Sequence, residues 1–176
     1  MPTVQSVRIG TPHIKLPIGN RNDCRGEYYS PEIIMNIENF KLKHLDGVEK
    51  IEKACFVHPW SRVDLQNQIS LDTSHFLVAT VDGKVAGYMG LQIFGGEGYV
   101  TNVAVLPEYR KQGIAESLVR AQMKHKMSFI TLEVRESNVP AVSLYTKCGF
   151  KNVGIRPNFY TDPTENAIIM TYEFED

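Results

Sequence analysis

The spacing of apolar residues becomes regular at Phe40 and predicts a strand followed by two helices. Phe40 and Leu42 alternate as in a short strand. A second helix is expected after Ser61, because a Ser followed three positions later by Asp64 has the form of a capping box. The apolar residues that mark the buried faces of the two helices are Leu45, Val48, Ile51 and Cys55 for the first, and Leu65 and Ile69 for the second.

A hairpin and a further strand are predicted next. Residues 76–81 and 85–94 read as antiparallel strands, because the Asp82-Gly83 pair between them supplies the positive φ angles of a two-residue turn. A glycine-rich break at 95–98 then precedes an apolar strand at 99–105. This part of the chain therefore predicts antiparallel neighbours within a sheet.

The remaining pattern alternates between helices and strands. Strands are expected at 129–134, 150–155 and 167–174, with a polar loop at 156–165. A helix at 139–147 is closed by Gly149, which suits the left-handed end of a helix. Another helix face is marked by Ile114, Leu118, Ala121 and His125. Together these elements predict an α/β (α+β) fold, with a mixed, mostly antiparallel sheet of about six or seven strands flanked by helices.

Residues 1–35 differ from the rest of the chain, because four prolines and three glycines interrupt every possible period. We expect an irregular N-terminal extension here and a single domain at 36–176, a division that suits 176 residues with 43% hydrophobic content. The sequence leaves open whether the extension reflects an upstream start, a disordered tail or an arm that packs on the domain.

The charge balance narrows the range of partners. A formal net charge of -1, with 22% charged residues, indicates no direct binding of nucleic acid. No stretch has the roughly 18 to 20 unbroken apolar residues of a membrane span, and no basic segment followed by an apolar run opens the chain. We therefore expect a protein that acts away from the membrane.

Cysteine and histidine usage points to a reducing compartment and gives no sign of a metal site. Three cysteines without a Cys-x-x-Cys pair argue against a disulfide framework and for the cytoplasm. The five histidines have no metal-ligand spacing with the cysteines, so we interpret them as surface or packing residues.

The segment from Asn102 to Ala115 is the most informative one, because it runs from a buried strand through a tight loop into a helix. Gly113 lets a ligand approach the main chain, and the first helical turn has N–H groups without a helical partner. The helix dipole favours negative charge at the same place. The segment is neither a Walker A loop nor a GxGxxG fingerprint, so it indicates an anionic cofactor other than the ligands of those motifs.

In its sequence context, Arg110-x-x-Gly113-x-Ala115 resembles the pyrophosphate loop of the GCN5-related N-acetyltransferases (GNAT). The resemblance runs from about Met35 to the C-terminus, and the further stretches are most similar to the RimI-type subgroup, which acetylates protein N-terminal amines. Those stretches are Ala54 to Ser61, Leu132 to Asn138, Leu144-Tyr145 with Gly149-Phe150, and Glu165 to Met170.

This resemblance implies acetyl-CoA as the cosubstrate and assigns residues to it. The main chain of Val103, Ala104 and Val105 would bind the pantetheine arm and polarise the thioester. Asn138 would contact the same arm, although by position it also reads as a helix N-cap. The N–H groups around the pyrophosphate would come from Lys111, Gln112, Gly113, Ile114, Ala115 and Glu116.

The resemblance also implies the catalytic groups. Glu133 would be the general base, although a carboxylate in this apolar strand could instead pair with Arg135 or lie at a sheet edge. Tyr145 would donate a proton to the leaving thiolate, or else pack half-buried, and Tyr160 stays open as the alternative donor. Trp60 and Tyr160 would contact the acceptor.

The implied reaction is acetylation of the N-terminal alanine of a small-subunit ribosomal protein, number eighteen in the usual naming. The alternatives are an acetyltransferase for a lysine side chain or a small amine, and a coenzyme A-binding sensor without turnover. Phe159 and Asn166 depart from the tyrosine and aspartate of the subgroup, which leaves the peptide contacts open. The sequence gives no indication of oligomeric state.

Overall fold

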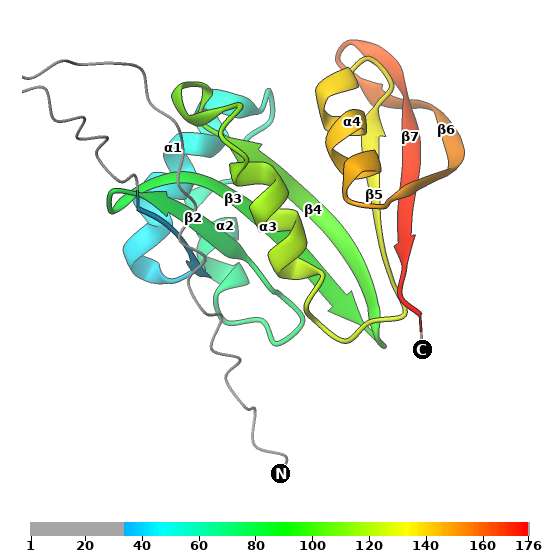
Figure 1. The fold of residues 1–176 in the computed structure, drawn as a ribbon. Helices are drawn as coiled ribbons and strands as arrows, with labels where there is room; N and C mark the ends of the chain where they lie inside the picture. The colour runs from blue at the N-terminus through cyan, green and yellow to red at the C-terminus, as the bar shows by residue number, and fades with distance from the viewer. Residues whose placement is uncertain (1–33, 176) are drawn as a thin grey trace, which may run out of the picture.

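The structure, a computed structural model, describes residues 34–175, so the expected extension at 1–35 lies almost wholly outside the described residues. Within this range the chain forms one sheet of seven strands, flanked by four α-helices (Figure 1). The strands are β1 (Met35–Asn39), β2 (Leu77–Val81), β3 (Lys84–Phe94), β4 (Glu97–Val105), β5 (Phe129–Arg135), β6 (Lys151–Thr161) and β7 (Thr164–Glu173). The helices are α1 (Leu45–Cys55), α2 (Arg62–Gln68), α3 (Ile114–Gln122) and α4 (Val139–Lys147), with short 3-10 turns at Leu42–His44 and Pro107–Tyr109.

The strand order in the sheet is β1-β2-β3-β4-β5-β7-β6. Every neighbouring pair is antiparallel except β4 and β5, which run parallel. That parallel pairing spans only Glu97 to Tyr99 on β4 and Phe129 to Thr131 on β5, after which the two strands diverge (Figure 1). The predicted mixed, mostly antiparallel sheet is confirmed, and its one parallel junction is short.

Helices cover both faces of the sheet. On one face, α3 and α4 bury Leu118 and Tyr145 in a cluster with the β5 residue Ile130. On the other face, α1 and α2 bury Val48 and Leu65 in a second cluster. Because side chains alternate along a strand, residues of β5 that do not enter the first cluster face the side of α1 and α2.

Several local predictions are confirmed by backbone geometry. The Ser61 hydroxyl accepts from the Asp64 N–H at 3.2 Å and caps α2. Asp82 and Gly83 have φ angles of 48° and 77°, as the hairpin turn requires. The helix predicted at 139–147 is α4, and Gly149 follows it with a φ of 95°. These signals are short-range, which explains why the sequence alone reveals them.

The strand predicted at Phe40 and Leu42 is wrong. The first strand is instead β1, which ends at Asn39 before Phe40, and the chain enters a 3-10 helix at Leu42. Leu42 is 63% exposed, so the two alternating residues were not one buried stripe. The buried pair is Met35 and Ile37, which lie on β1 opposite β2.

The polar loop predicted at 156–165 is also wrong. This stretch belongs to β6 and β7, and only Asp162 and Pro163 lie between the two strands. β6 is an edge strand with a single neighbour and is exposed along most of its length, so its composition is polar. An edge strand also tolerates Pro157, whose missing N–H would break an inner ladder.

The start of one strand and the end of one helix also differ from the predicted positions. β4 begins at Glu97, inside the predicted glycine-rich break, and α3 ends at Gln122, before His125.

None of the helices in the described part of the chain is long and apolar enough to cross a membrane.

Candidate active site

The loop between β4 and α3 has an open helix N-terminus. Gly113 is the N-cap of α3 with a φ of 77°, and Lys111 before it has a φ of 59°. The first helical hydrogen bond runs from the Ser117 N–H to the Gly113 carbonyl at 3.0 Å, so the preceding N–H groups have no helical partner. A side-chain carbon at Gly113 would meet no atom within 4 Å, so the space in front of this turn is free of described protein atoms.

The loop is fastened to the end of β4 by Arg110. Its Nε donates to the Val105 carbonyl at 3.1 Å, and its Nη2 lies 3.8 Å from the Cys55 sulfur. The Cys55 thiol in turn donates to the Val105 carbonyl at 3.7 Å. The end of α1, the end of β4 and the loop therefore meet at one point.

At residues 103–105, which are predicted to bind the acetyl donor, the main chain of β4 is paired with a neighbouring strand on one side only. Val103 and Val105 pair with Met89 and Gly87 of β3. The pairing of β4 with β5 has already ended at Tyr99, so no β5 residue pairs with 103–105. Asn138 lies at the start of α4, and its side-chain oxygen accepts from the Ala141 N–H at 3.3 Å. The predicted N-cap at Asn138 is confirmed.

Glu133 faces the α1 and α2 side of the sheet, because its β5 neighbours Leu132 and Val134 are buried in the cluster on the opposite face. Its carboxylate is 3.2 Å from the Arg156 guanidinium of β6, and 32% of its side chain is exposed. The alternative prediction, an ion pair between Glu133 and Arg135, is wrong, because Arg135 pairs with Glu165 at 3.1 Å.

Tyr145 is buried on α4, with 7% of its surface exposed, and its ring packs 5.7 Å from the Phe150 ring. It is more deeply buried than the half-exposed packing role would require. Burial raises the pKa of Tyr145 above its usual value, and the neighbouring Tyr160 and Cys148 act in the same direction. The phenol, protonated at neutral pH even at its ordinary pKa of about 10, is therefore a weaker acid here.

A cavity of about 340 Å³ lies between the segment after α1 and the β6–β7 hairpin. It is lined by Cys55, Phe56, Val57, His58, Arg135, Phe159, Tyr160, Thr161 and Asp162. Of the two predicted acceptor residues, Tyr160 lines this cavity and Trp60 does not. The centre of the Trp60 ring instead lies 6.0 Å from that of the Phe76 ring, and Trp60 packs against the second cluster.

Arg135 organises the opposite wall, a role that the sequence did not reveal. Its guanidinium lies 4.2 Å from the centre of the Tyr160 ring, and its Nη2 donates to the Asp162 carbonyl at 2.7 Å. The Tyr160 hydroxyl donates to the Glu133 carbonyl at 3.2 Å. Burial raises the pKa of Tyr160, and Arg135 opposes this shift. No local pattern signals these contacts, because they join segments more than twenty residues apart.

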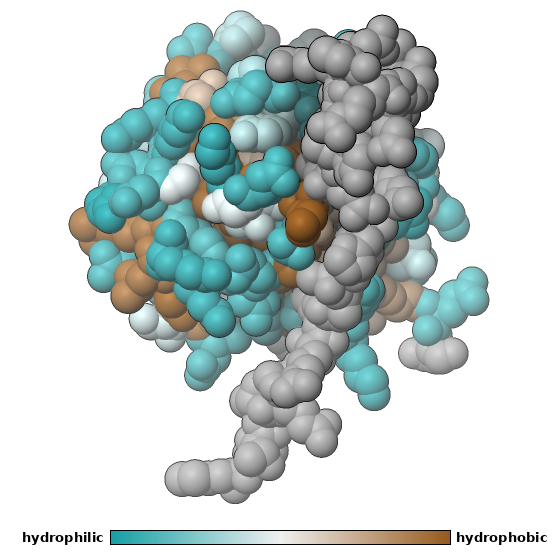
Figure 2. All heavy atoms as spheres, turned by 60° about the vertical axis from the view of Figure 1, so that its left-hand side comes forward, coloured by the Kyte–Doolittle hydropathy of each residue, from teal (hydrophilic) through white to brown (hydrophobic). Residues whose placement is uncertain are grey.

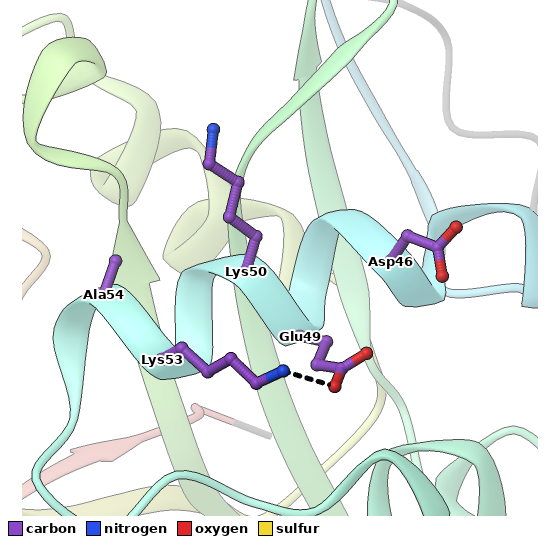
Figure 3. Close-up of a pocket in the computed structure, with 5 residues that line it drawn as sticks. All are labelled: Asp46, Glu49, Lys50, Lys53 and Ala54. Atoms are coloured by element: carbon purple, nitrogen blue, oxygen red, sulfur yellow. Dashed lines mark hydrogen bonds and ion pairs between the residues drawn. The ribbon is translucent and has the colours of Figure 1, made fainter.

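A second hollow lies on α1 and has no connection with these groups (Figure 3). Three of its charged side chains form ion pairs: Lys53 contacts Glu49 at 2.7 Å, and Asp46 and Glu49 each contact Arg62 at 2.7 Å. The residues that line it are Asp46, Glu49, Lys50, Lys53 and Ala54. Hydrophilic residues predominate on the face shown in Figure 2, with hydrophobic ones in smaller groups between them. Within residues 34–175, no three His, Cys, Asp or Glu side chains are placed to hold a metal ion.

Known proteins are similar to this chain in both sequence and fold. The putative [ribosomal protein bS18]-alanine N-acetyltransferase of Bacillus subtilis is 40% identical over 139 residues, which cover 76% of this chain and 92% of that protein. The [ribosomal protein bS18]-alanine N-acetyltransferase of Escherichia coli K12 is 33% identical over 140 residues, or 76% of this chain and 94% of that one.

Solved structures agree with this match. The ribosomal-protein-S18-alanine N-acetyltransferase from Escherichia coli superposes with a TM-score of 0.74 and 30% identity, over 81% of this chain and 95% of that chain. Arabidopsis thaliana NAA60 in complex with acetyl-CoA shares the fold, with a TM-score of 0.71 and 19% identity over 80% and 99% of the two chains. The sequence model of the Acetyltransferase (GNAT) family matches residues 45–150. The chain therefore belongs to the GNAT family of acetyltransferases.

Proposed function

We propose that this protein transfers the acetyl group of acetyl-CoA to the α-amino group of the N-terminal alanine of ribosomal protein bS18. The names of the Bacillus subtilis and Escherichia coli relatives support this acceptor. We assign the activity to a single domain at 36–176, and a ribosomal acceptor suits a cytoplasmic enzyme. One observation carries the proposal. The open helix N-terminus and the acceptor cavity meet through Cys55, which lines the cavity and contacts both Arg110 of the loop and the end of β4.

The donor side fits coenzyme A in its chemistry. When bound, acetyl-CoA supplies an acetyl thioester and brings a negatively charged diphosphate. Unpartnered N–H groups at the start of α3 suit that diphosphate, and the left-handed Gly113 leaves the approach open. We assign the N–H groups of 111–116 to the diphosphate. The main chain of 103–105 and the side chain of Asn138 are assigned to the pantetheine arm.

Glu133 is the proposed general base. An α-amino group has an ordinary pKa of about 8, so near pH 7 most of it carries a proton that must leave before it can attack an acyl group. The carboxylate faces the side of the sheet where the acceptor cavity lies, and Glu133 and Arg135 are two residues apart on β5. Glu133 accepts that proton directly or through one water.

Tyr145 is the proposed proton donor to the departing sulfur. Its hydroxyl is protonated at neutral pH, as a phenol with the ordinary pKa of about 10 already is, so it has a proton to donate. The Tyr160 hydroxyl already donates to the Glu133 carbonyl, which favours Tyr145 over Tyr160 for this step. Tyr160 instead forms part of the acceptor wall. Trp60 is proposed to act on the acceptor indirectly, because its packing on Phe76 holds the end of the segment after α1.

Two peptides test the acceptor. Incubation with labelled acetyl-CoA should acetylate a peptide with the free N-terminal sequence of bS18 and leave a blocked peptide that carries one lysine unmodified, as measured by intact mass. Acetylation of the lysine peptide alone would contradict the proposal and indicate a side-chain acetyltransferase. Calorimetric binding of acetyl-CoA without acetylation of any free amine would instead indicate a sensor.

A further inference from the structure

The buried carboxylate of Glu52 has no part in the proposed chemistry. Glu52 lies in the last turn of α1 and is fully buried, with 0% of its surface exposed. Its Oε1 accepts from the Tyr88 hydroxyl and, at 3.3 Å, from the Asn102 side-chain amide. Its Oε2 accepts from the Trp60 main-chain N–H at 2.6 Å. The carboxylate thus joins α1, β3, β4 and the segment after α1.

A buried carboxylate needs a physical reason. Removing it from water is costly, and an apolar side chain of similar volume is often at least as favourable for stability. All three partners of Glu52 are donors, so both oxygens are satisfied. A group of this kind specifies a geometry more than it adds stability. The relevant question is which part of the molecule it holds in place.

Glu52 holds both ends of the segment that forms one wall of the acceptor cavity. Its main-chain carbonyl accepts from the Phe56 N–H at 3.0 Å, and its carboxylate accepts from the Trp60 N–H. Between these two bonds, Val57 is 69% exposed and His58 is also exposed. Phe56 and Trp60 pack partly on the second cluster, whereas burial contributes little at Val57 and His58. The path of the chain between the two ends therefore depends on the two hydrogen bonds to Glu52.

We propose that Glu52 is a positioning residue for the acceptor. It fixes the segment 56–60 so that Phe56, Val57 and His58 line the cavity, and it touches neither the donor nor the reacting atoms. The inference rests on the proposed function, because it assigns this cavity to the peptide. It concerns one side of the site, since the α3 loop does not contact Glu52 and the contact with β4 is to the side chain of Asn102, not to the main chain of 103–105.

A pair of substitutions separates this role from general stability. Glu52→Met keeps the side-chain length but removes the acceptor for Trp60, so the KM for the alanine peptide should rise about tenfold. The KM for acetyl-CoA and the kcat should change less than about twofold, a change worth under half a kcal/mol. Glu52→Gln should recover the peptide KM, because its amide oxygen can accept from Trp60 while its NH2 group donates to Tyr88 or to a reoriented Asn102. Glu49→Met, one turn earlier on α1, is the matched control and should change neither KM, because the Glu49 carboxylate pairs with Lys53 and Arg62 and not with the segment 56–60.

Trp60 is the single tryptophan of the chain, so its fluorescence reports on this segment without any assay of turnover. Acrylamide should quench it more strongly in Glu52→Met than in the wild type, Glu52→Gln or Glu49→Met. If Glu52→Met does not fold, the double variant Glu52→Met with Tyr88→Phe, which also removes the stranded hydroxyl, takes its place.

An unchanged peptide KM, or an equal rise in the KM for both substrates, would overturn the inference, and so would unchanged quenching. A wild-type protein inactive on alanine peptides would instead contradict the proposed function. In that case the quenching comparison alone would decide whether Glu52 fixes the segment.

Discussion

The donor side and the acceptor side of the site are built in different ways. Apart from Asn138 of α4, the proposed donor side is one continuous stretch from β4 into α3, and its proposed contacts are mostly main-chain groups. The acceptor cavity is assembled from separate parts of the chain, namely the segment after α1, the end of β5 and the β6–β7 hairpin. Its walls depend on side chains such as Glu52 and Arg135.

This difference has a consequence for specificity. A main-chain site needs only a backbone conformation, which a short motif can encode and many sequences can preserve. A side-chain site changes with each substitution in any of its parts, so relatives with the same donor loop can accept different amines. Substitutions on the two sides should therefore separate into effects on donor affinity and effects on the acceptor.

The largest expected effect is on the chemical step, at the proposed general base. Glu133→Gln should lower kcat by about 100-fold or more, because the amine loses its proton acceptor. Calorimetry should find the affinity for acetyl-CoA within about twofold of the wild type, since the carboxylate has no proposed contact with the diphosphate. Glu173→Gln, on an exposed residue of β7, is the control and should behave as wild type.

A similar loss of donor affinity in Glu133→Gln would show that the residue shapes the sheet. It would also remove the proposed separation between the two sides.

The next effect should fall on the donor alone. Gly113→Asp places a negative charge at the start of α3, where the diphosphate is proposed to bind, and should weaken acetyl-CoA binding by about 30-fold. Gly83→Asp is a matched control, because Gly83 has the same φ of 77° and equally open surroundings in the β2–β3 turn. Titration calorimetry of both variants shows whether the loss of affinity is specific to position 113. Equal affinities would place the diphosphate elsewhere.

Tyr145→Phe should reduce kcat about tenfold, because the departing sulfur loses its proton donor. Tyr160→Phe is the companion variant and should affect mainly the peptide KM, since its hydroxyl contacts the Glu133 main chain. Stopped-flow measurement of thiol release gives the rate of the step itself. A reversed order, with the larger kcat loss in Tyr160→Phe, would transfer the donor role to Tyr160.

The smallest expected effect concerns the acceptor wall. Arg135→Met removes the cation that stacks on Tyr160 and should raise the peptide KM about threefold, with little change in the KM for acetyl-CoA. Steady-state kinetics with each substrate varied in turn provides the measurement. A rise confined to the acetyl-CoA KM would show that the hairpin serves the donor side.

The sequence predicts the features that depend on neighbouring residues and misses those that depend on contacts between distant segments. Ser61 with Asp64, the Asp82-Gly83 turn and Gly149 are local signals, and the structure confirms each one. The first half of β6 was predicted at 150–155, but its second half was mistaken for a loop, because this edge strand is exposed along most of its length. The Arg156 partner of Glu133 and the burial of Glu52 arise from contacts between distant segments, which no spacing along the chain encodes.

The short parallel junction between β4 and β5 has a consequence for heat resistance. Strands β1 to β4 and strands β5 to β7 form two hydrogen-bonded groups that share only the pairing from Glu97 to Tyr99. A ligand whose contacts span 103–105 on one group and Asn138 beside the other would join them by a second link. Because such a ligand binds the native state alone, the melting temperature should climb with the logarithm of its concentration.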